Sequence, residues 1–104
     1  MRALWTEFAW NMLSQTADYV LMEFGYRTYE GFVQDVETAV SCIVANVNSG
    51  EVEPCLQGKA REYRSMVVNK RNKLVYEVRE DEGVIYIIDF WDTRRDPQLL
   101  MASH

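Results

Sequence analysis

The residues best suited to chemistry in this chain of 104 residues are the lysines and arginines of its second half. Residues 59–73 hold six of them against one acid, although the chain as a whole has a net charge of −5. Arg94 and Arg95 follow a largely apolar run after two intervening residues, Asp92 and Thr93. Guanidinium and ammonium groups donate hydrogen bonds to phosphates and carboxylates. The pattern therefore predicts a local surface for a phosphate-rich or acidic partner, because attraction by the whole molecule is weak at this net charge.

Acid–base chemistry has fewer candidates. Cleavage of RNA through its 2′-hydroxyl needs a proton acceptor, a cation for the phosphorane charge and a proton donor for the leaving oxygen. His104 is the one histidine and the last residue, where fraying is expected. Arginine is too basic to accept a proton readily at neutral pH. These residues therefore favour binding over a conventional histidine-based nuclease.

The two cysteines, Cys42 and Cys55, are far apart and have no neighbouring histidine, so we expect neither a metal site nor a disulfide. No apolar run approaches the roughly 18 residues that span a membrane, and the N-terminus lacks the pattern of a secretion signal. The sequence predicts a cytoplasmic protein with free thiols and without cofactor, membrane contact or small-molecule substrate.

Apolar periodicity predicts the elements that must position the cations. Residues 1–5 could form a leading strand. An apolar stripe from Phe8 to Phe24 predicts a helix of about 17 residues, with Thr6 as its N-cap and Gly25 closing it. A second stripe predicts a helix from near Thr28 to residue 47. The short connection predicts that the two helices pack antiparallel as a hairpin.

Three strands are predicted over residues 61–68, 73–79 and 84–91, after a loop over residues 48–60. The third strand is apolar on both faces, which suits a central position in a sheet. The fold class is therefore α+β, a single domain over residues 1–104 in the order (β)ααβββ, with an antiparallel sheet packed against a helical hairpin. We expect the guanidinium groups to gather at a common rim of this sheet.

The residues after the third strand are the strongest candidate contact. If the strand continues, Arg94 and Arg95 point to opposite sides, so one of them would face a partner and the other would pair with Asp92 or Asp96. Trp91 is the best candidate for a partly exposed aromatic contact. The alternative for all these cations is a solvated sheet edge that prevents pairing between molecules.

Several short motifs, in this order, resemble the RelE/ParE superfamily of bacterial toxins from toxin–antitoxin systems, and the ParE branch more closely. They are Trp5-Thr6 before the first helix, Phe24-Gly25 at its end, Glu62-Tyr63-Arg64, the strand over residues 73–78 and the closing residues 92–97. The resemblance implies a cytoplasmic growth inhibitor that is neutralised by a cognate antitoxin. Members of the family differ in target, since some cleave mRNA on the ribosome and ParE-type toxins inhibit DNA gyrase.

Resemblance to the ribonuclease branch would imply a cluster of lysine and arginine on the sheet and a tyrosine near the C-terminus. On this sequence the corresponding positions hold Arg64, Met66, Lys73 and Arg94, and the tyrosine falls near Leu100. Methionine and leucine lack the required chemistry. The resemblance therefore favours a toxin that binds gyrase without covalent chemistry. The alternative is a ribosome-dependent mRNA endonuclease that uses Arg64, Lys73 and Arg94, and a third reading is a member that only binds its antitoxin.

For either activity, the residues expected to bind target or antitoxin are Arg61, Arg64, Lys73, Trp91, Arg94 and Arg95. We expect an antitoxin to wrap the helical hairpin and the sheet edge, with acidic side chains meeting Arg64 or Arg95. Part of the surface of Met12, Met22 or Val36 should then be exposed in the free chain.

Overall fold

A five-stranded sheet forms the centre of the molecule. The structure is a computed structural model, which describes residues 1–59 and 61–104. The strand order is β1-β5-β4-β3-β2. β1 runs parallel to β5, and the other neighbours are antiparallel. The strands are β1 (Arg2–Trp5), β2 (Glu51–Val52), β3 (Tyr63–Val67), β4 (Asn72–Arg79) and β5 (Val84–Asp92). The predicted α+β fold is confirmed, although β1 adds a parallel strand to the sheet that was predicted as antiparallel. β5 lies inside the sheet between β1 and β4, as its two apolar faces indicate.

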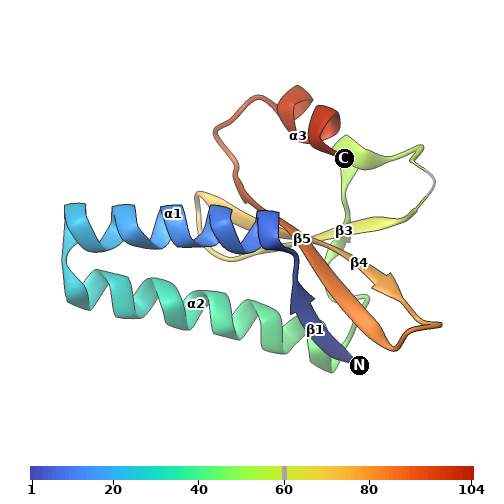
Figure 1. Cartoon of the computed structure of the whole chain (residues 1–104), viewed down its shortest axis with the longest axis horizontal. Coiled ribbons are helices and arrows are strands. Elements are labelled where there is room, and N and C mark those ends of the chain that lie inside the picture. The colour runs from blue at the N-terminus through green and yellow to red at the C-terminus, as the bar shows by residue number, and fades with distance from the viewer. Residues whose placement is uncertain (60) are drawn as a thin grey trace.

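Two antiparallel helices cover one face of this sheet, and their connected ends project past it (Figure 1). α1 (Glu7–Phe24) begins after Thr6, whose hydroxyl accepts a hydrogen bond from the Ala9 N–H at 3.1 Å. α2 (Tyr26–Ala45) starts two residues before the predicted Thr28. Gly25 alone connects the helices, because its φ of +88° lets the chain reverse within one residue. The predicted cap and hairpin are confirmed.

The main core lies between the helical hairpin and the sheet. α2 contributes four buried apolar side chains, whereas Ala9 is the buried residue of α1. The buried members of this core are Ala9, Phe32, Val36, Ala39, Ile43, Leu74, Tyr76, Ile85, Ile87 and Phe90. The distal half of α1 therefore contributes little to the core, which is why the side chains of Tyr19 and Phe24 stay more than half exposed.

A second, smaller cluster covers the opposite face of the sheet. It contains Leu56, Val75, Trp91 and Leu100, and it is closed by the 3₁₀ turn η1 (Pro54–Leu56) and the helix α3 (Pro97–Ser103). Figure 1 shows α3 on the side of the sheet away from α2. The two faces of β5 are therefore both covered. The register shifts between Val75 and Tyr76, where β5 contains one extra residue.

The sequence pattern did not predict η1, α3 or β2. η1 and β2 lie in the predicted loop over residues 48–60, of which Ala60 is outside the described residues. α3 had a local signal, since Asp96 accepts a hydrogen bond from the Gln98 N–H at 2.9 Å and Pro97 occupies the first turn. Within the described residues, no helix has the length and apolar character to cross a bilayer.

Gly50 joins the end of the helical hairpin to the sheet. Its N–H donates to the Tyr76 hydroxyl at 3.0 Å, and that hydroxyl donates to the Val47 carbonyl at 2.9 Å. A Cβ atom at Gly50 would lie 2.5 Å from the Ser65 carbonyl oxygen and 2.6 Å from the Tyr76 hydroxyl. The close approach of two backbone segments therefore requires glycine at this position.

We predict that Gly50→Ala destabilises the fold by about 2 kcal/mol, because one of the two segments must move. Gly31→Ala is the matched control, since a Cβ atom there meets nothing within 4 Å and the residue lies inside α2. It should stabilise the chain by about 0.5–1 kcal/mol. Urea unfolding of both variants measures the two changes, and equal stability of both would contradict the assignment.

Candidate partner-binding site

The Lys73 side chain forms an ion pair within the protein. Its ammonium group lies 2.8 Å from both carboxylate oxygens of Glu53, whose side chain is fully buried. Burial by itself raises the pKa of Glu53, but hydrogen bonds from Lys73 and Ser65 and the charge of Lys73 outweigh burial and hold it below its ordinary value of 4.5. Glu53 is thus an ionised buried acid that depends on one cation, and Lys73 is not free for a phosphate.

Arg61 and Arg64 line a hollow of about 310 Å³ at the edge of the sheet, together with Glu62, Glu77 and Tyr76. Arg64 donates to the Gly50 carbonyl at 2.9 Å and lies 2.8 Å from a Glu62 carboxylate oxygen. The Nε of Arg61 lies 3.7 Å from Glu77. Both cations thus already have acidic neighbours in this hollow.

β5 ends at Asp92, so the strand does not continue through Arg94 and Arg95, which lie in the turn after it and contact different neighbours. Arg94 makes a two-point contact with Asp92, at 3.2 and 2.9 Å, and this contact lowers the pKa of Asp92. The pairing of one arginine with Asp92 is therefore confirmed. Arg94 also lines a hollow of about 350 Å³ with Tyr19, Phe24 and Arg71. The Arg95 guanidinium lies 4.6 Å from the centre of the Trp91 ring.

Trp91 does not have the partly exposed position that we expected from the sequence. Its side chain is 3% exposed, because Leu100 of α3 packs beside it and Arg95 lies over its ring. The prediction of exposure is wrong for a physical reason: the sequence pattern did not include α3, the helix that covers this face.

The expectation of a common rim of guanidinium groups is also wrong. Arg64 lies opposite Tyr76 in the ladder, on the face with the helical hairpin, whereas Lys73 adjoins Val75 and pairs with Glu53 on the other face. Arg94 lies near the connected ends of the two helices, with Tyr19 and Phe24. Strand alternation therefore separates Arg64 from Lys73, and Arg94 lies apart from both in the turn after β5, so the three residues that a ribonuclease mechanism would need together are not together.

His104 is held in place, contrary to the fraying expected from its position. Its Nε2 lies 2.9 Å from Asp89 Oδ2, and its ring meets the Phe8 ring edge-on at 6.1 Å. Asp89 is buried on β5, and one of its oxygens has no hydrogen-bond partner among the described residues. The imidazole thus fastens the end of α3 to the sheet. Within the described residues, no group of three histidine, cysteine or acidic side chains could hold a metal ion.

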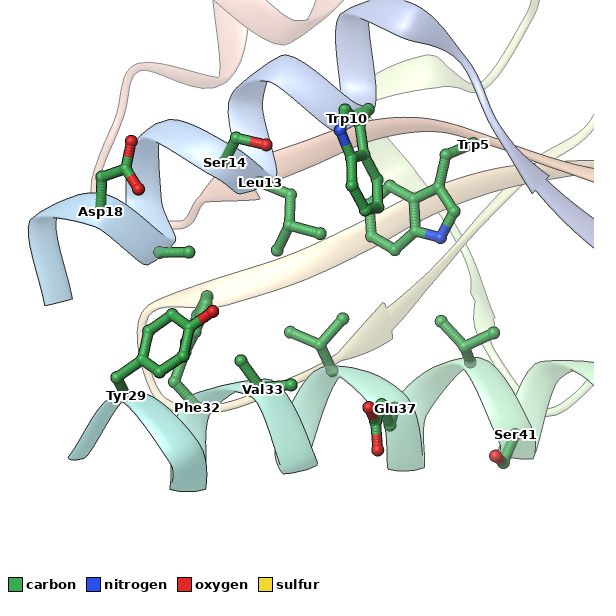
Figure 2. A pocket seen from close by; sticks show the side chains of 13 residues that line it. Trp5, Trp10, Leu13, Ser14, Asp18, Tyr29, Phe32, Val33, Glu37 and Ser41 are labelled. Atoms are coloured by element: carbon green, nitrogen blue, oxygen red, sulfur yellow. The ribbon is translucent and has the colours of Figure 1, made fainter. Parts of the chain in front are cut away.

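A hollow of about 650 Å³ lies between α1 and α2. We call it the interhelical groove. Figure 2 shows the indoles of Trp5 and Trp10 at one end and the ring of Tyr29 at the other, with Leu13 and Val33 between them. The two indoles meet edge-on, with ring centres 5.9 Å apart. The Trp10 side chain is 54% exposed.

Two acids lie at the outer edges of the interhelical groove, Asp18 on α1 and Glu37 on α2 (Figure 2). Neither has an ion-pair partner among residues 1–59 and 61–104. No lysine or arginine lines the described groove. Of the three side chains expected to show exposed surface, Met22 is 82% exposed and Met12 is half-buried, whereas Val36 is buried in the groove floor.

Comparison with solved structures identifies the fold. The fold is the RelE/ParE-like toxin fold that the sequence resemblance implied. No family model matches the sequence, and no curated protein matches it. Among solved structures, the chain is similar to the chromosomal ParDE TA system from P. aeruginosa, with a TM-score of 0.69 and 19% identity over 88% of this chain and 95% of that chain.

Two further structures share the fold. The YoeB/ParE toxin from Agrobacterium tumefaciens has a TM-score of 0.61 at 17% identity, over 88% of this chain and 98% of that chain. The YoeB dimer from Staphylococcus aureus has a TM-score of 0.55 at 17% identity, over 88% of this chain and 94% of that chain.

We predict that Lys73→Met lowers the free energy of unfolding at pH 7 by about 3 kcal/mol, because Glu53 would keep a buried charge without its partner. The folded pKa of Glu53 is depressed, so the stability from this pair is present above pH 4.5 and is lost as the pH falls through the folded pKa. The difference from the parent chain should shrink below pH 4.5.

Urea unfolding at several pH values from 7 to 3 measures this loss. Lys70→Met is the control, since the Lys70 side chain is exposed and has no ion-pair partner among the described residues. A loss of stability in Lys73→Met that is unchanged at acid pH would show that the ion pair is not its source.

Proposed function

We propose that this chain is the toxin of a bacterial toxin–antitoxin pair, that it inhibits growth in the cytoplasm by binding DNA gyrase, and that a cognate antitoxin neutralises it. The shared fold with ParE- and YoeB-type toxins, over 88% of the chain, supports the class. The motifs around Arg64 and Arg94 that resemble the ParE branch support the target.

A binding mechanism fits the side chains better than a catalytic one. The observation that carries this choice is the separation of Arg64, Lys73 and Arg94 onto different surfaces, with Lys73 neutralised by Glu53. A phosphorane needs its cation and its proton donor at one point in space. A partner surface can instead be contacted by cations spread over several positions.

The interhelical groove is the natural place for the antitoxin. A cavity of about 650 Å³ with an apolar floor of Leu13, Val33 and Val36 accommodates several side chains of a docked segment. The exposed apolar side chains of Trp10 and Met22 lie on the same hairpin. An antitoxin that wraps the hairpin would remove this surface from water, which gives the hydrophobic driving force for tight binding.

The target contact is assigned to the exposed cations outside the interhelical groove. Arg94 is exposed and shares its hollow with Arg71 and the exposed rings of Tyr19 and Phe24. Arg61, Arg64 and Arg95 remain further candidates for target or antitoxin contact. Lys73 and Trp91 would contribute indirectly, because Lys73 holds Glu53 and Trp91 supports Arg95.

Induced expression in bacteria tests the proposed activity. We expect growth arrest with gyrase-trapped DNA breaks and intact transcripts, reversed by co-expression of the cognate antitoxin. Codon-phased cuts in mRNA would instead establish the ribonuclease alternative, and unaffected growth would indicate a member that only binds its antitoxin. The measurements are colony counts, DNA-break mapping and transcript-end mapping.

We further predict that Arg94→Gln reduces growth inhibition at least tenfold in colony counts while the unfolding midpoint stays the same, because an exposed ion pair adds little to stability. Arg27→Gln is the matched control, since Arg27 is exposed on α2 and lines none of the hollows described here. Full toxicity of Arg94→Gln would remove Arg94 from the target contact.

A further inference from the structure

The interhelical groove also indicates what kind of segment binds in it. Its surface combines two indoles and a phenol with two carboxylates, and no cation of the described residues lines it. The helical half of the chain is acidic, with a net charge of −6 over residues 1–57. An acidic segment would therefore enter this groove against the local field, whereas a basic segment would be attracted.

We propose that the interhelical groove binds a basic amphipathic segment, which places aliphatic side chains on Leu13, Val33 and Val36 and arginine or lysine beside Asp18 and Glu37. The inference rests on the proposed function, in which the occupant is the neutralising segment of the antitoxin. It reverses the charge that the sequence predicted for that segment, because the sequence pattern drew attention to the cations of the sheet.

Three features of the groove favour this occupant. The exposed ring of Trp10 offers a face for a guanidinium group, and Tyr29 offers a second aromatic ring at the other end. Asp18 and Glu37 stand on opposite helices, so cations on both flanks of one segment can reach an acid. Both acids lack ion-pair partners among the described residues, so binding breaks no existing pair.

The cations that the sequence pattern assigned to the antitoxin contact already have partners within the chain. Arg64 already contacts Glu62 and the Gly50 carbonyl, and Arg95 lies over Trp91. An acidic antitoxin segment would have to compete with those contacts. A basic segment in the groove gains its charge interactions without such competition, and it buries apolar surface at the same time.

Three synthetic peptides test the proposal with the full chain. All three have the same apolar helical face, and their flanking positions hold arginine, glutamine or glutamate. Dissociation constants are measured by fluorescence anisotropy at low and at high salt. We expect the arginine peptide to bind roughly tenfold more tightly than the glutamate peptide, with the glutamine peptide between them. Added salt should reduce the difference.

Two double variants locate the effect. Asp18→Asn with Glu37→Gln removes both groove acids, and it should abolish the preference for arginine. Glu23→Gln with Asp35→Asn removes one acid from each helix outside the interhelical groove, changes the net charge equally and should leave the preference intact. The unfolding midpoint of each variant confirms that the fold is retained.

The proposal is overturned if the glutamate peptide binds as tightly as the arginine peptide, if the preference survives removal of Asp18 and Glu37, or if no peptide binds. Failure of the proposed function is recognised separately. A chain that prefers the arginine peptide but does not inhibit growth refutes the toxin assignment alone. An antitoxin complex that is unaffected by the groove variants refutes the groove assignment and leaves the toxin assignment in place.

Discussion

The two apolar faces of β5 are the constraint on which the rest of the structure depends. A strand with Ile85, Ile87 and Phe90 on one face and Trp91 on the other cannot leave either face in water. The helical hairpin covers the first face, and η1 with α3 covers the second. β1 and β4 flank β5, so its backbone groups are also paired. Strand alternation then assigns Arg64, Lys73 and Trp91 each to one of the two covered faces, whereas Arg94 and Arg95 lie in the turn that follows β5.

The sequence predicted the helices and strands well, because their periodicity and caps are local. Thr6, Gly25 and the stripe of α2 each act within a few residues. The sequence pattern did not predict η1 and α3, which cover the second face of β5, because the evidence for them is not local. The two-faced pattern of β5 implied that something must cover Trp91, but only the approach of Leu100 and Leu56 in three dimensions identifies it. The signal nearest to α3, Asp96 followed by Pro97, is short and was interpreted as the end of the motif.

The candidate site was harder to predict than the fold, and Lys73 shows why. A run of cations in the sequence suggests a common surface, but neighbouring residues in a strand face opposite ways. Some of these cations then meet acids that are distant in sequence, as Lys73 meets Glu53 and Arg61 meets Glu77. Buried Glu53 needs Lys73 to remain ionised without a large cost. Part of the positive charge therefore stabilises this fold. The charge pattern of the sequence alone does not reveal this role.

The exposed helical hairpin relates the stability of the fold to the proposed binding of an antitoxin. α1 buries little, and the connected ends of α1 and α2 project past the sheet with large apolar side chains in water (Figure 1). A chain of this size gains limited stability from its own core. A partner that binds only the folded form would shift the folding equilibrium toward it by mass action. An occupied interhelical groove would pack both helices against a common segment. The same contact that neutralises such a chain would then also stabilise the part of it that its own sheet leaves uncovered.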